Sequence, residues 1–329
     1  WDAENVHLDT INWYIVAQES TAATMFENGE LDQYQPTGDY AIKFAKEAEE
    51  GKYQYMVTDY PGTTGLRFNF INGGTSGLMS NVKIRKAISY SIDREEMIDA
   101  VYGRYNPAYS YVAPAITFNG SSYRSQVGEV IEDEYNEYVG DPDKIVALFQ
   151  EGLDELGVET PIEDITLTYL TSGSTTEGQA EREYIQQSLE ETLGLTVELS
   201  VAGDNSLFIA DRNEGNYDFF LGGWYSDYND PLDFLYTNYT DAYGMSFGGY
   251  SNPDYDALAD QLVGETDMDK RLDIYKQMEQ VLLLDDCAFA PIYYATKQVL
   301  LQNWVKDYRT SSFGASAEFI WTYIDGKNQ

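Results

Sequence analysis

The stretch GGWYSDYNDPLDFL, residues 222–235, gathers the side chains that are best suited to bind a charged ligand. Asp227 closely follows Trp224 and Tyr225, and the glycines and proline of this stretch disfavour a regular helix or strand. A carboxylate that is removed from water needs a cation or hydrogen bonds, because its desolvation costs several kcal/mol. If the aromatic rings shield one side of Asp227, its carboxylate can bind an ammonium group, which contributes about 1.5–3 kcal/mol. A purely structural interpretation stays open, in which Asp227 caps a turn and Trp224 belongs to the core.

Other kinds of chemistry find little support in the sequence. The chain has one histidine, His7, and one cysteine, Cys287, so neither a Ser-His-Asp triad nor a zinc site is expected. Cys287 lies among apolar residues in LLLDDCAFAPIYY, which predicts a buried thiol. The segments GTTG and GGTSG lack the lysine and helix of a phosphate-binding loop, and no calcium-loop pattern occurs. We therefore expect no cofactor, no metal site and no catalytic residue.

The composition is that of an acidic, folded chain of 329 residues. The 20 basic and 56 acidic residues give a net charge of −36, which disfavours binding to nucleic acid or anionic lipid. We interpret this charge mainly as a means of keeping the surface soluble. With 43% hydrophobic residues the chain can form a sizeable core, and no apolar stretch is long enough to span a membrane.

The hydrophobic pattern predicts an α/β fold with a mixed sheet. Its clearest region comprises, in chain order, a strand at 165–171, a helix at 177–194, a strand at 195–202, a helix near 205–215 and a strand at 217–221. The stretch that contains Asp227 follows the last of these strands. In open α/β sheets ligands bind at the carboxyl ends of strands, so the position of Asp227 agrees with a binding role.

Other segments also carry local signals. DPDKIVALFQEGLDELG predicts a helix that has Asp141 as its N-cap and ends at Gly157. LDTINWYIV, residues 8–16, alternates apolar and polar residues and predicts a strand. PGTTG at 61–65 predicts a turn, and residues 103–140 have no steady period and predict a long loop region with little regular structure.

Four segments resemble, in the right order, a family of large solute-binding proteins that serve oligopeptide and dipeptide ABC importers. The segments are the start of the chain from Trp1 to Asp32, NVKIRKAISYSIDREEMIDAVYG (81–103), YDFFLGGWYSDYNDPLDFL (217–235) and APIYY (290–294). Because the matches keep their order along the whole chain, the resemblance is more specific than a single motif.

The resemblance implies a Venus-flytrap fold, in which two lobes close on an extended peptide whose main chain pairs with protein strands. Family chains extend further at the N-terminus, so this chain is identified as a C-terminal fragment. Residues 1–65 and 297–329 would then be parts of lobe I. Residues 66–296 would form lobe II, a lobe with a mixed α/β sheet.

The resemblance also assigns site residues. Asp227 falls where peptide-binding members place the carboxylate that binds the ligand's α-amino group. Leu221 stands where one well-known enterobacterial member has an arginine that helps to bind peptide carboxylates, and Arg67 is the substitute cation that we expect. The residues that correspond to the segment flanking the ligand's backbone are Trp224, Tyr225 and Ser226.

The expected function is therefore that of a non-catalytic, monomeric solute-binding protein, extracellular or periplasmic, that delivers peptides to the permease subunits of an ABC importer. Any membrane attachment would come from a lipid anchor outside this chain. Another solute is an alternative, since some members of the family bind oligosaccharides, nickel chelates or haem. A glycoside hydrolase is less well supported, because 56 acidic residues produce carboxylate pairs about 5–10 Å apart by chance. A purely adhesive surface module is the remaining alternative.

Overall fold

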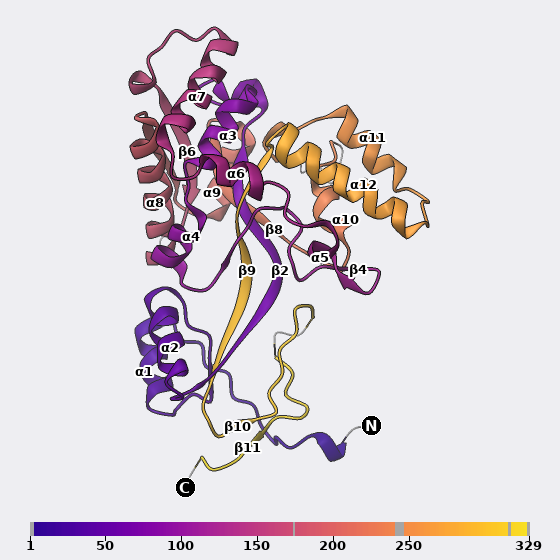
Figure 1. Ribbon diagram of the computed structural model, residues 1–329. Coiled ribbons are helices and arrows are strands. Elements are labelled where there is room, and N and C mark those ends of the chain that lie inside the picture. The colour runs from indigo at the N-terminus through magenta and orange to yellow at the C-terminus, as the bar shows by residue number, and fades with distance from the viewer. Residues whose placement is uncertain (1–2, 174, 241–246, 315–316, 328–329) are drawn as a thin grey trace.

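The computed structural model describes residues 3–173, 175–240, 247–314 and 317–327 (Figure 1). The α-helices are α1 (Glu19–Glu27), α2 (Gly38–Glu49), α3 (Val82–Tyr90), α4 (Arg94–Met97), α5 (Tyr123–Val127), α6 (Glu132–Tyr138), α7 (Pro142–Leu156), α8 (Thr176–Leu193), α9 (Asn205–Glu214), α10 (Pro231–Leu235), α11 (Pro253–Gln261) and α12 (Met268–Gln280). The strands are β1 (Gln33–Tyr34), β2 (Gln54–Phe68), β3 (Asn106–Pro107), β4 (Thr117–Phe118), β5 (Ser121–Ser122), β6 (Thr166–Ser172), β7 (Thr196–Ala202), β8 (Phe219–Tyr225), β9 (Phe289–Leu301), β10 (Val305–Lys306) and β11 (Tyr323–Ile324). The π-helical turns η4 (Ile98–Tyr102) and η8 (Val281–Asp285) continue α4 and α12.

A mixed sheet forms the centre of the molecule. Its strand order is β1-β9-β2-β8-β6-β7, and β3 pairs with β9. β6 runs parallel to both β7 and β8, whereas β2 is antiparallel to both β8 and β9. The predicted α/β class with a mixed sheet is therefore confirmed.

Hydrophobic cores lie on both faces of this sheet. On one face α3, α7 and α8 pack around residues such as Leu66 and Phe219. On the other face α10, α11 and α12, together with residues 108–131, pack around Tyr275 and Phe289. A separate, smaller core joins α1 and α2 to the far end of β9 (Figure 1).

The long strands β2 and β9 connect the large cores to the small one. The predicted lobe boundaries, after Gly65 and after Thr296, both fall inside these strands. A direct contact adds to this connection, because Glu177 on α8 accepts a hydrogen bond of 3.2 Å from the backbone N–H of Gly38 on α2. The Glu177 carboxylate also forms a bidentate ion pair with Arg104, with one N–O distance of 2.6 Å.

Local sequence signals set several helix boundaries correctly. The Asp141 side chain caps α7, Pro142 occupies its first turn, and Gly157 ends it in the left-handed region at φ 68°. The predicted helix and its ends are thereby confirmed. In the same way Asp93 caps α4 by accepting a hydrogen bond from the Glu96 N–H.

The prediction of a turn at residues 61–65 is wrong, because these residues lie inside β2. The register of β2 with β9 shifts between Asp59 and Thr63, which marks a β-bulge that accommodates the Pro-Gly pair. On the other side of β2, Gly62 pairs with Tyr225 of β8. From Thr63 to Gly65 the strand has partners on both sides, β8 and β9, and this tertiary pairing overrides the turn tendency of Pro and Gly.

The other irregular segments also differ from the prediction. Residues 8–16 form no strand, and the side chains of Trp13 and Ile15 are 71% and 102% exposed. An alternating pattern forms a strand only where a neighbouring strand supplies hydrogen-bond partners, and none of the described residues does so here. Residues 103–140 contain α5, α6 and the short strands β3 to β5, so they are more regular than predicted.

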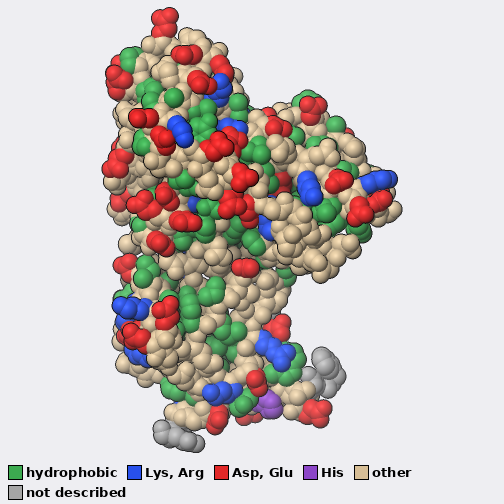
Figure 2. Space-filling model, viewed as in Figure 1, with side chains coloured by type: hydrophobic (Ala, Val, Ile, Leu, Met, Phe, Trp, Pro, Cys, Tyr) green, Lys and Arg blue, Asp and Glu red, His purple; other side chains and the backbone are tan. Residues whose placement is uncertain are grey.

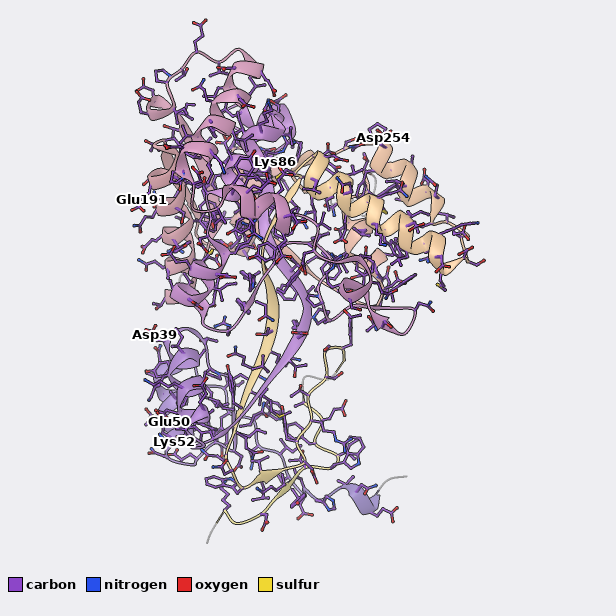
Figure 3. All side chains as sticks on the ribbon, viewed as in Figure 1. Asp39, Glu50, Lys52, Lys86, Glu191 and Asp254 are labelled. Atoms are coloured by element: carbon purple, nitrogen blue, oxygen red, sulfur yellow. The ribbon has the colours of Figure 1, made fainter. Side chains whose placement is uncertain are left out.

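Acidic side chains are spread over separate elements of the molecule. Figure 2 shows Asp and Glu side chains across the visible face of both the larger part and the α1–α2 unit. Figure 3 places Asp39 and Glu50 at the ends of α2, Glu191 on α8 and Asp254 on α11. Among the described residues, no helix combines the length and the apolar character needed to cross a bilayer.

Candidate ligand-binding site

The candidate site is the loop between β8 and α10, residues 226–230. It begins where the pairing of β8 with β2 ends, at Tyr225 opposite Gly62. It ends at Asp230, whose side chain accepts a hydrogen bond of 2.8 Å from the Leu232 N–H and so caps α10. Because β8 runs parallel to β6, the loop lies at the carboxyl end of a parallel strand pair, where α/β folds bind ligands.

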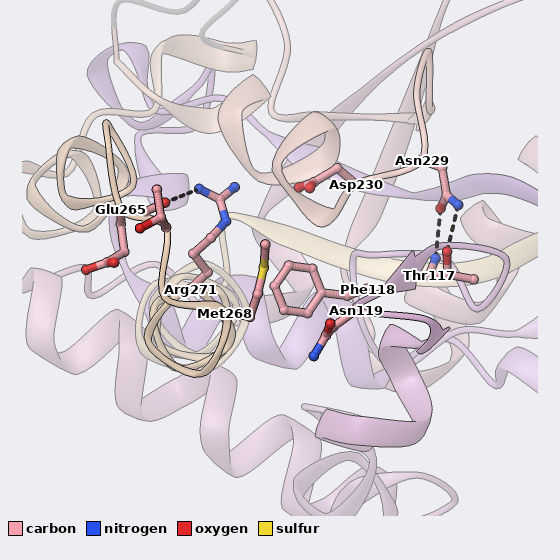
Figure 4. Close-up of a pocket in the computed structure, with 9 residues that line it drawn as sticks. Thr117, Phe118, Asn119, Asn229, Asp230, Glu265, Met268 and Arg271 are labelled. Atoms are coloured by element: carbon pink, nitrogen blue, oxygen red, sulfur yellow. Dashed lines mark hydrogen bonds between the residues drawn. The ribbon is translucent and has the colours of Figure 1, made fainter.

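Neighbouring elements hold this loop at both of its ends. The Ser226 N–H donates to the Pro61 carbonyl of β2 at 2.7 Å. Asn229 accepts a hydrogen bond from the Thr117 N–H at 2.8 Å and donates one to the Thr117 hydroxyl at 2.6 Å (Figure 4). The loop is thus attached to β2 and to β4, which limits the entropy that it can lose when a ligand binds.

A buried carboxylate, Asp233 on α10, holds the middle of the loop. Its Oδ2 atom accepts hydrogen bonds from the Trp224 indole N–H at 2.8 Å and from the Asp227 backbone N–H at 2.9 Å. The side chain of Asp233 is 7% exposed. Asp233 lies inside the stretch 222–235, but no pattern along the chain distinguishes it from the neighbouring Asp230.

The Asp227 side chain itself is exposed. Among the described residues, no Lys or Arg forms an ion pair with its carboxylate. The expected shielding by Trp224 and Tyr225 is absent, since the Trp224 indole is directed to Asp233 and Tyr225 is itself 46% exposed. Asp227 is therefore a hydrated carboxylate on a fixed loop, with its charge available to a ligand.

Tyr225 extends over the bulge in β2. A Cβ atom at Gly62 would lie 2.3 Å from the Tyr225 ring, so the ring can occupy this position only because residue 62 is glycine. Tyr60 lies next to it, with the ring centroids 5.7 Å apart, and the Lys297 Nζ is 4.7 Å from the Tyr60 centroid. Burial lowers the pKa of Lys297. Sequence patterns did not identify Tyr60 or Lys297 as neighbours of Tyr225, because they predict a turn where β2 has a bulge.

Strand pairing extends further along one edge of β8 than along the other. β6 pairs with β8 only at Phe219 and Phe220, whereas the pairing of β8 with β2 continues to Tyr225. Among the described residues, no strand pairs with 221–225 on the side of β6. The main-chain N–H and C=O groups of this edge are therefore suited to pair with an added extended chain.

Arg67 does not join the other predicted site residues. Its side chain is 2% exposed and donates hydrogen bonds to Asn238 Oδ1 at 3.1 Å and to the Tyr111 hydroxyl at 2.6 Å. The guanidinium carbon also lies 4.7 Å from the Phe289 ring centroid. These contacts place Arg67 inside the core around α10 and α12, away from the exposed Asp227.

An open cavity of about 430 Å³ adjoins the same loop (Figure 4). Its charged lining residues are already engaged, since the Arg271 guanidinium donates to the Tyr275 hydroxyl at 2.5 Å and to the Glu265 carbonyl at 3.3 Å. The Tyr275 hydroxyl in turn donates to Asp230 at 2.9 Å. We interpret this cavity as a surface hollow beside the hydrogen-bonded chain of Arg271, Tyr275 and Asp230, which supports the loop.

Cys287 is a buried thiol and not a reactive group at the surface. The Cys287 side chain is 3% exposed, which confirms the predicted buried thiol, and burial raises its pKa to about 11. No group of three or more His, Cys, Asp or Glu residues within the described ranges is arranged to hold a metal ion.

Solved structures share this architecture. An oligopeptide ABC transporter substrate-binding domain from Bacillus anthracis aligns with 99% of this chain and 61% of its own length, with a TM-score of 0.77 and 25% identity. Listeria monocytogenes OppA, solved bound to peptide, aligns with 99% of this chain and 60% of its own length, with a TM-score of 0.75 and 28% identity. The chain thus has the fold of the Venus-flytrap class.

The sequence comparisons give the family. The chain belongs to the bacterial extracellular solute-binding proteins, family 5, because the model described as "Bacterial extracellular solute-binding proteins, family 5 Middle" matches residues 1–246. The dipeptide-binding protein DppE of Bacillus subtilis (strain 168) is 30% identical over 305 residues, which is 92% of this chain and 52% of the relative. The chain therefore spans about half the length of the curated relatives that it matches.

Proposed function

We propose that the protein containing this chain binds peptides between lobe II, residues 66–296, and lobe I, and that Asp227 holds the ligand's α-amino group. The observation that carries this proposal is an exposed carboxylate, without an ion pair among the described residues, on a loop held by hydrogen bonds. A carboxylate of this kind can form a charge-assisted hydrogen bond with an ammonium group. The relatives named above, a dipeptide-binding protein and an OppA bound to peptide, support the choice of ligand.

The open edge of β8 supports the second part of the proposal. A peptide whose amino group lies at Asp227 would extend along residues 221–225 and form main-chain hydrogen bonds with them. Main-chain pairing accepts many side chains, while the carboxylate fixes the position of the first residue. Trp224, Tyr225 and Ser226 would then flank the ligand's backbone.

The remaining parts of the proposal concern the setting of the protein. We infer that it acts outside the cytoplasmic membrane as a monomer and passes peptides to the permease subunits of an ABC importer. A lipid anchor outside this chain would hold it at the membrane. Deleting the gene should then abolish peptide uptake by the cell while leaving uptake of free amino acids unchanged.

The first test is peptide binding by the full-length protein, measured by calorimetry with peptides of two to eight residues. Asp227→Asn keeps the size of the side chain but removes its charge. We expect the affinity for peptides to fall roughly tenfold to hundredfold, because a charge-assisted contact of about 1.5–3 kcal/mol is weakened. Asp143→Asn is the matched control, since Asp143 is an exposed carboxylate on α7 of the same lobe.

Two outcomes would contradict this proposal. Equal peptide affinities of the Asp227→Asn variant and the unchanged protein would remove Asp227 from the site. Binding of an oligosaccharide, a nickel chelate or haem in place of any peptide would reject the proposed ligand class.

A further inference from the structure

We propose that Asp233 is a positioning residue, which fixes Asp227 and Trp224 and strengthens the preference of the site for a positively charged ligand terminus. The inference rests on the proposed function, because it adds a residue to the same site. Asp233 does not itself need to touch the ligand. It acts through the two groups to which it is hydrogen bonded.

The geometry of Asp233 links the strand to the loop. One carboxylate oxygen accepts the Trp224 indole N–H at 2.8 Å and the Asp227 backbone N–H at 2.9 Å. The first bond sets the orientation of the indole at the end of β8. The second bond fixes the backbone of Asp227. It therefore also fixes the point from which the Asp227 side chain extends toward the ligand.

The helix that carries Asp233 is itself well fixed. Phe234 and Leu235 on α10 are both 0% exposed, so they hold this short helix in the core. At its start, Asp230 caps the helix and accepts a hydrogen bond of 2.9 Å from the Tyr275 hydroxyl of α12. The position of Asp233 is therefore set by the packing of lobe II and not by the loop that it supports.

The charge of Asp233 adds a second effect. Among the described residues, no Lys or Arg forms an ion pair with Asp233, and both donors to its Oδ2 atom are neutral N–H groups. The Asp233 carboxyl group lies in a buried position behind Asp227, where water and salt screen a charge less than at the surface. A carboxylate at this position attracts an ammonium group at Asp227 and has no comparable effect on an uncharged acetyl cap.

A merely structural role for Asp233 makes a different prediction. If Asp233 only stabilised α10, its loss would weaken the binding of charged and uncharged ligand termini alike. Asp218 is a suitable control, because it is 0% exposed, lies just before β8 and accepts hydrogen bonds from Ser76 and Thr168 at 2.7–2.8 Å. Asp218 thus resembles Asp233 in burial and bonding but lies at the opposite end of the strand.

The experiment compares tetra-alanine with N-acetylated tetra-alanine in calorimetric titrations of the full-length protein. These probes suit a site that binds mainly through the main chain. The unchanged protein should prefer the free amine by at least about tenfold, as expected for a charge-assisted hydrogen bond. Asp233→Ala should reduce this preference roughly tenfold and change the affinity for the acetylated peptide by less than about threefold. Asp233→Asn, which keeps an acceptor oxygen but loses the charge, should reduce the preference by an intermediate factor.

The control variants distinguish a positioning role of Asp233 from a purely structural one. Asp218→Asn should lower the melting temperature but leave the preference for the free amine unchanged. If Asp233→Ala does not fold, Asp233→Asn still decides the question, and an unchanged preference in this variant overturns the inference. An equal loss of affinity for both peptides also overturns it and assigns Asp233 a structural role. If the unchanged protein shows no preference for the free amine, Asp227 does not bind the α-amino group. The positioning role of Asp233 is then rejected as well.

Discussion

At the scale of single residues, the carboxylates of this protein differ in which groups donate hydrogen bonds to them. Glu279 on α12 is 0% exposed and accepts the backbone N–H groups of Tyr111 and Val112 at 3.2 and 3.0 Å, together with a bond from Arg124. Its donors are thus part of the fold, as the cost of burying a charge requires. Asp227 is exposed and has no such partners within the described part of the chain, so its donors come from water or from a ligand.

Glu181 on α8 gives a pH-dependent prediction at this scale. Burial raises its pKa from the ordinary 4.5 to about 7, although a hydrogen bond from Tyr102 acts in the opposite direction. The folded protein therefore binds this proton more tightly than the unfolded chain, and stability falls as the pH rises from about 4.5 through about 7. Glu181→Gln, which mimics the protonated form, should raise the unfolding free energy by about 1–3 kcal/mol at pH 8, since each pKa unit corresponds to about 1.4 kcal/mol.

Urea denaturation of the variant and of the unchanged protein at pH 5 and at pH 8 checks this prediction. The gain should shrink as the pH falls, because Glu181 is then protonated in the unchanged protein too. Glu183→Gln is the matched control, because Glu183 is exposed on the same helix. A gain for Glu181→Gln that is equal at both pH values would contradict the assigned cause.

At the scale of elements, buried arginines join segments that are far apart in the sequence. The Arg94 side chain at the start of α4 is 0% exposed, and its guanidinium donates to the Pro291 carbonyl of β9 at 2.8 Å and to the Ala108 carbonyl at 3.2 Å. It also lies 4.2 Å from the Tyr135 ring centroid of α6. Arg94 thus connects α4, β9, α6 and the segment after β3, which explains structurally why an arginine follows the cap residue Asp93.

Replacing Arg94 by methionine should lower the unfolding free energy by about 3 kcal/mol or more. Methionine fills a similar volume but leaves several buried carbonyl groups without donors, each costing about 1–3 kcal/mol. Chemical denaturation measures the change, and Lys144→Met serves as the control because the Lys144 side chain is 58% exposed. A loss below about 1 kcal/mol would show that water replaces these hydrogen bonds.

At the scale of the whole molecule, the segment before α1 exposes several apolar side chains. Besides Trp13 and Ile15, the side chains of Val6 and Tyr14 are 52% and 61% exposed. Apolar side chains so close together at a surface usually mark a contact with another part of a protein. Since the chain spans about half the length of its relatives, the remaining length is the partner that we expect for this surface.

This expectation can be tested with a hydrophobic dye. The 329-residue chain should bind 8-anilinonaphthalene-1-sulfonate, and changing Trp13 and Ile15 together to serine should reduce the fluorescence at least about twofold, since these are the most exposed apolar side chains of the segment. The full-length protein should bind much less dye. There, the double variant should lower the unfolding free energy by about 2–5 kcal/mol, as for buried apolar residues. Equal dye binding by the full-length protein and by the chain would show that this surface stays exposed.

The sequence alone determined the elements whose signals are local. The helix at α7 and the strand and helix series from β6 to β8 follow from side-chain periodicity and from capping residues such as Asp141, which act within a few positions of the chain. The ordered motifs likewise identified the family. The stretch around Asp227 could be chosen as a candidate site because its residue types are unusual together.

Only the tertiary structure decided which groups meet across the fold. Residues 61–65 became part of a strand because β8 pairs with residues 62–65 and β9 with residues 63–65, whereas no described strand pairs with residues 8–16. The exposure of Asp227 and its support by Asp233 likewise depend on where α10 packs. Hydrogen-bond partners and burial are set by neighbours that are distant in sequence, and no pattern along the chain records them.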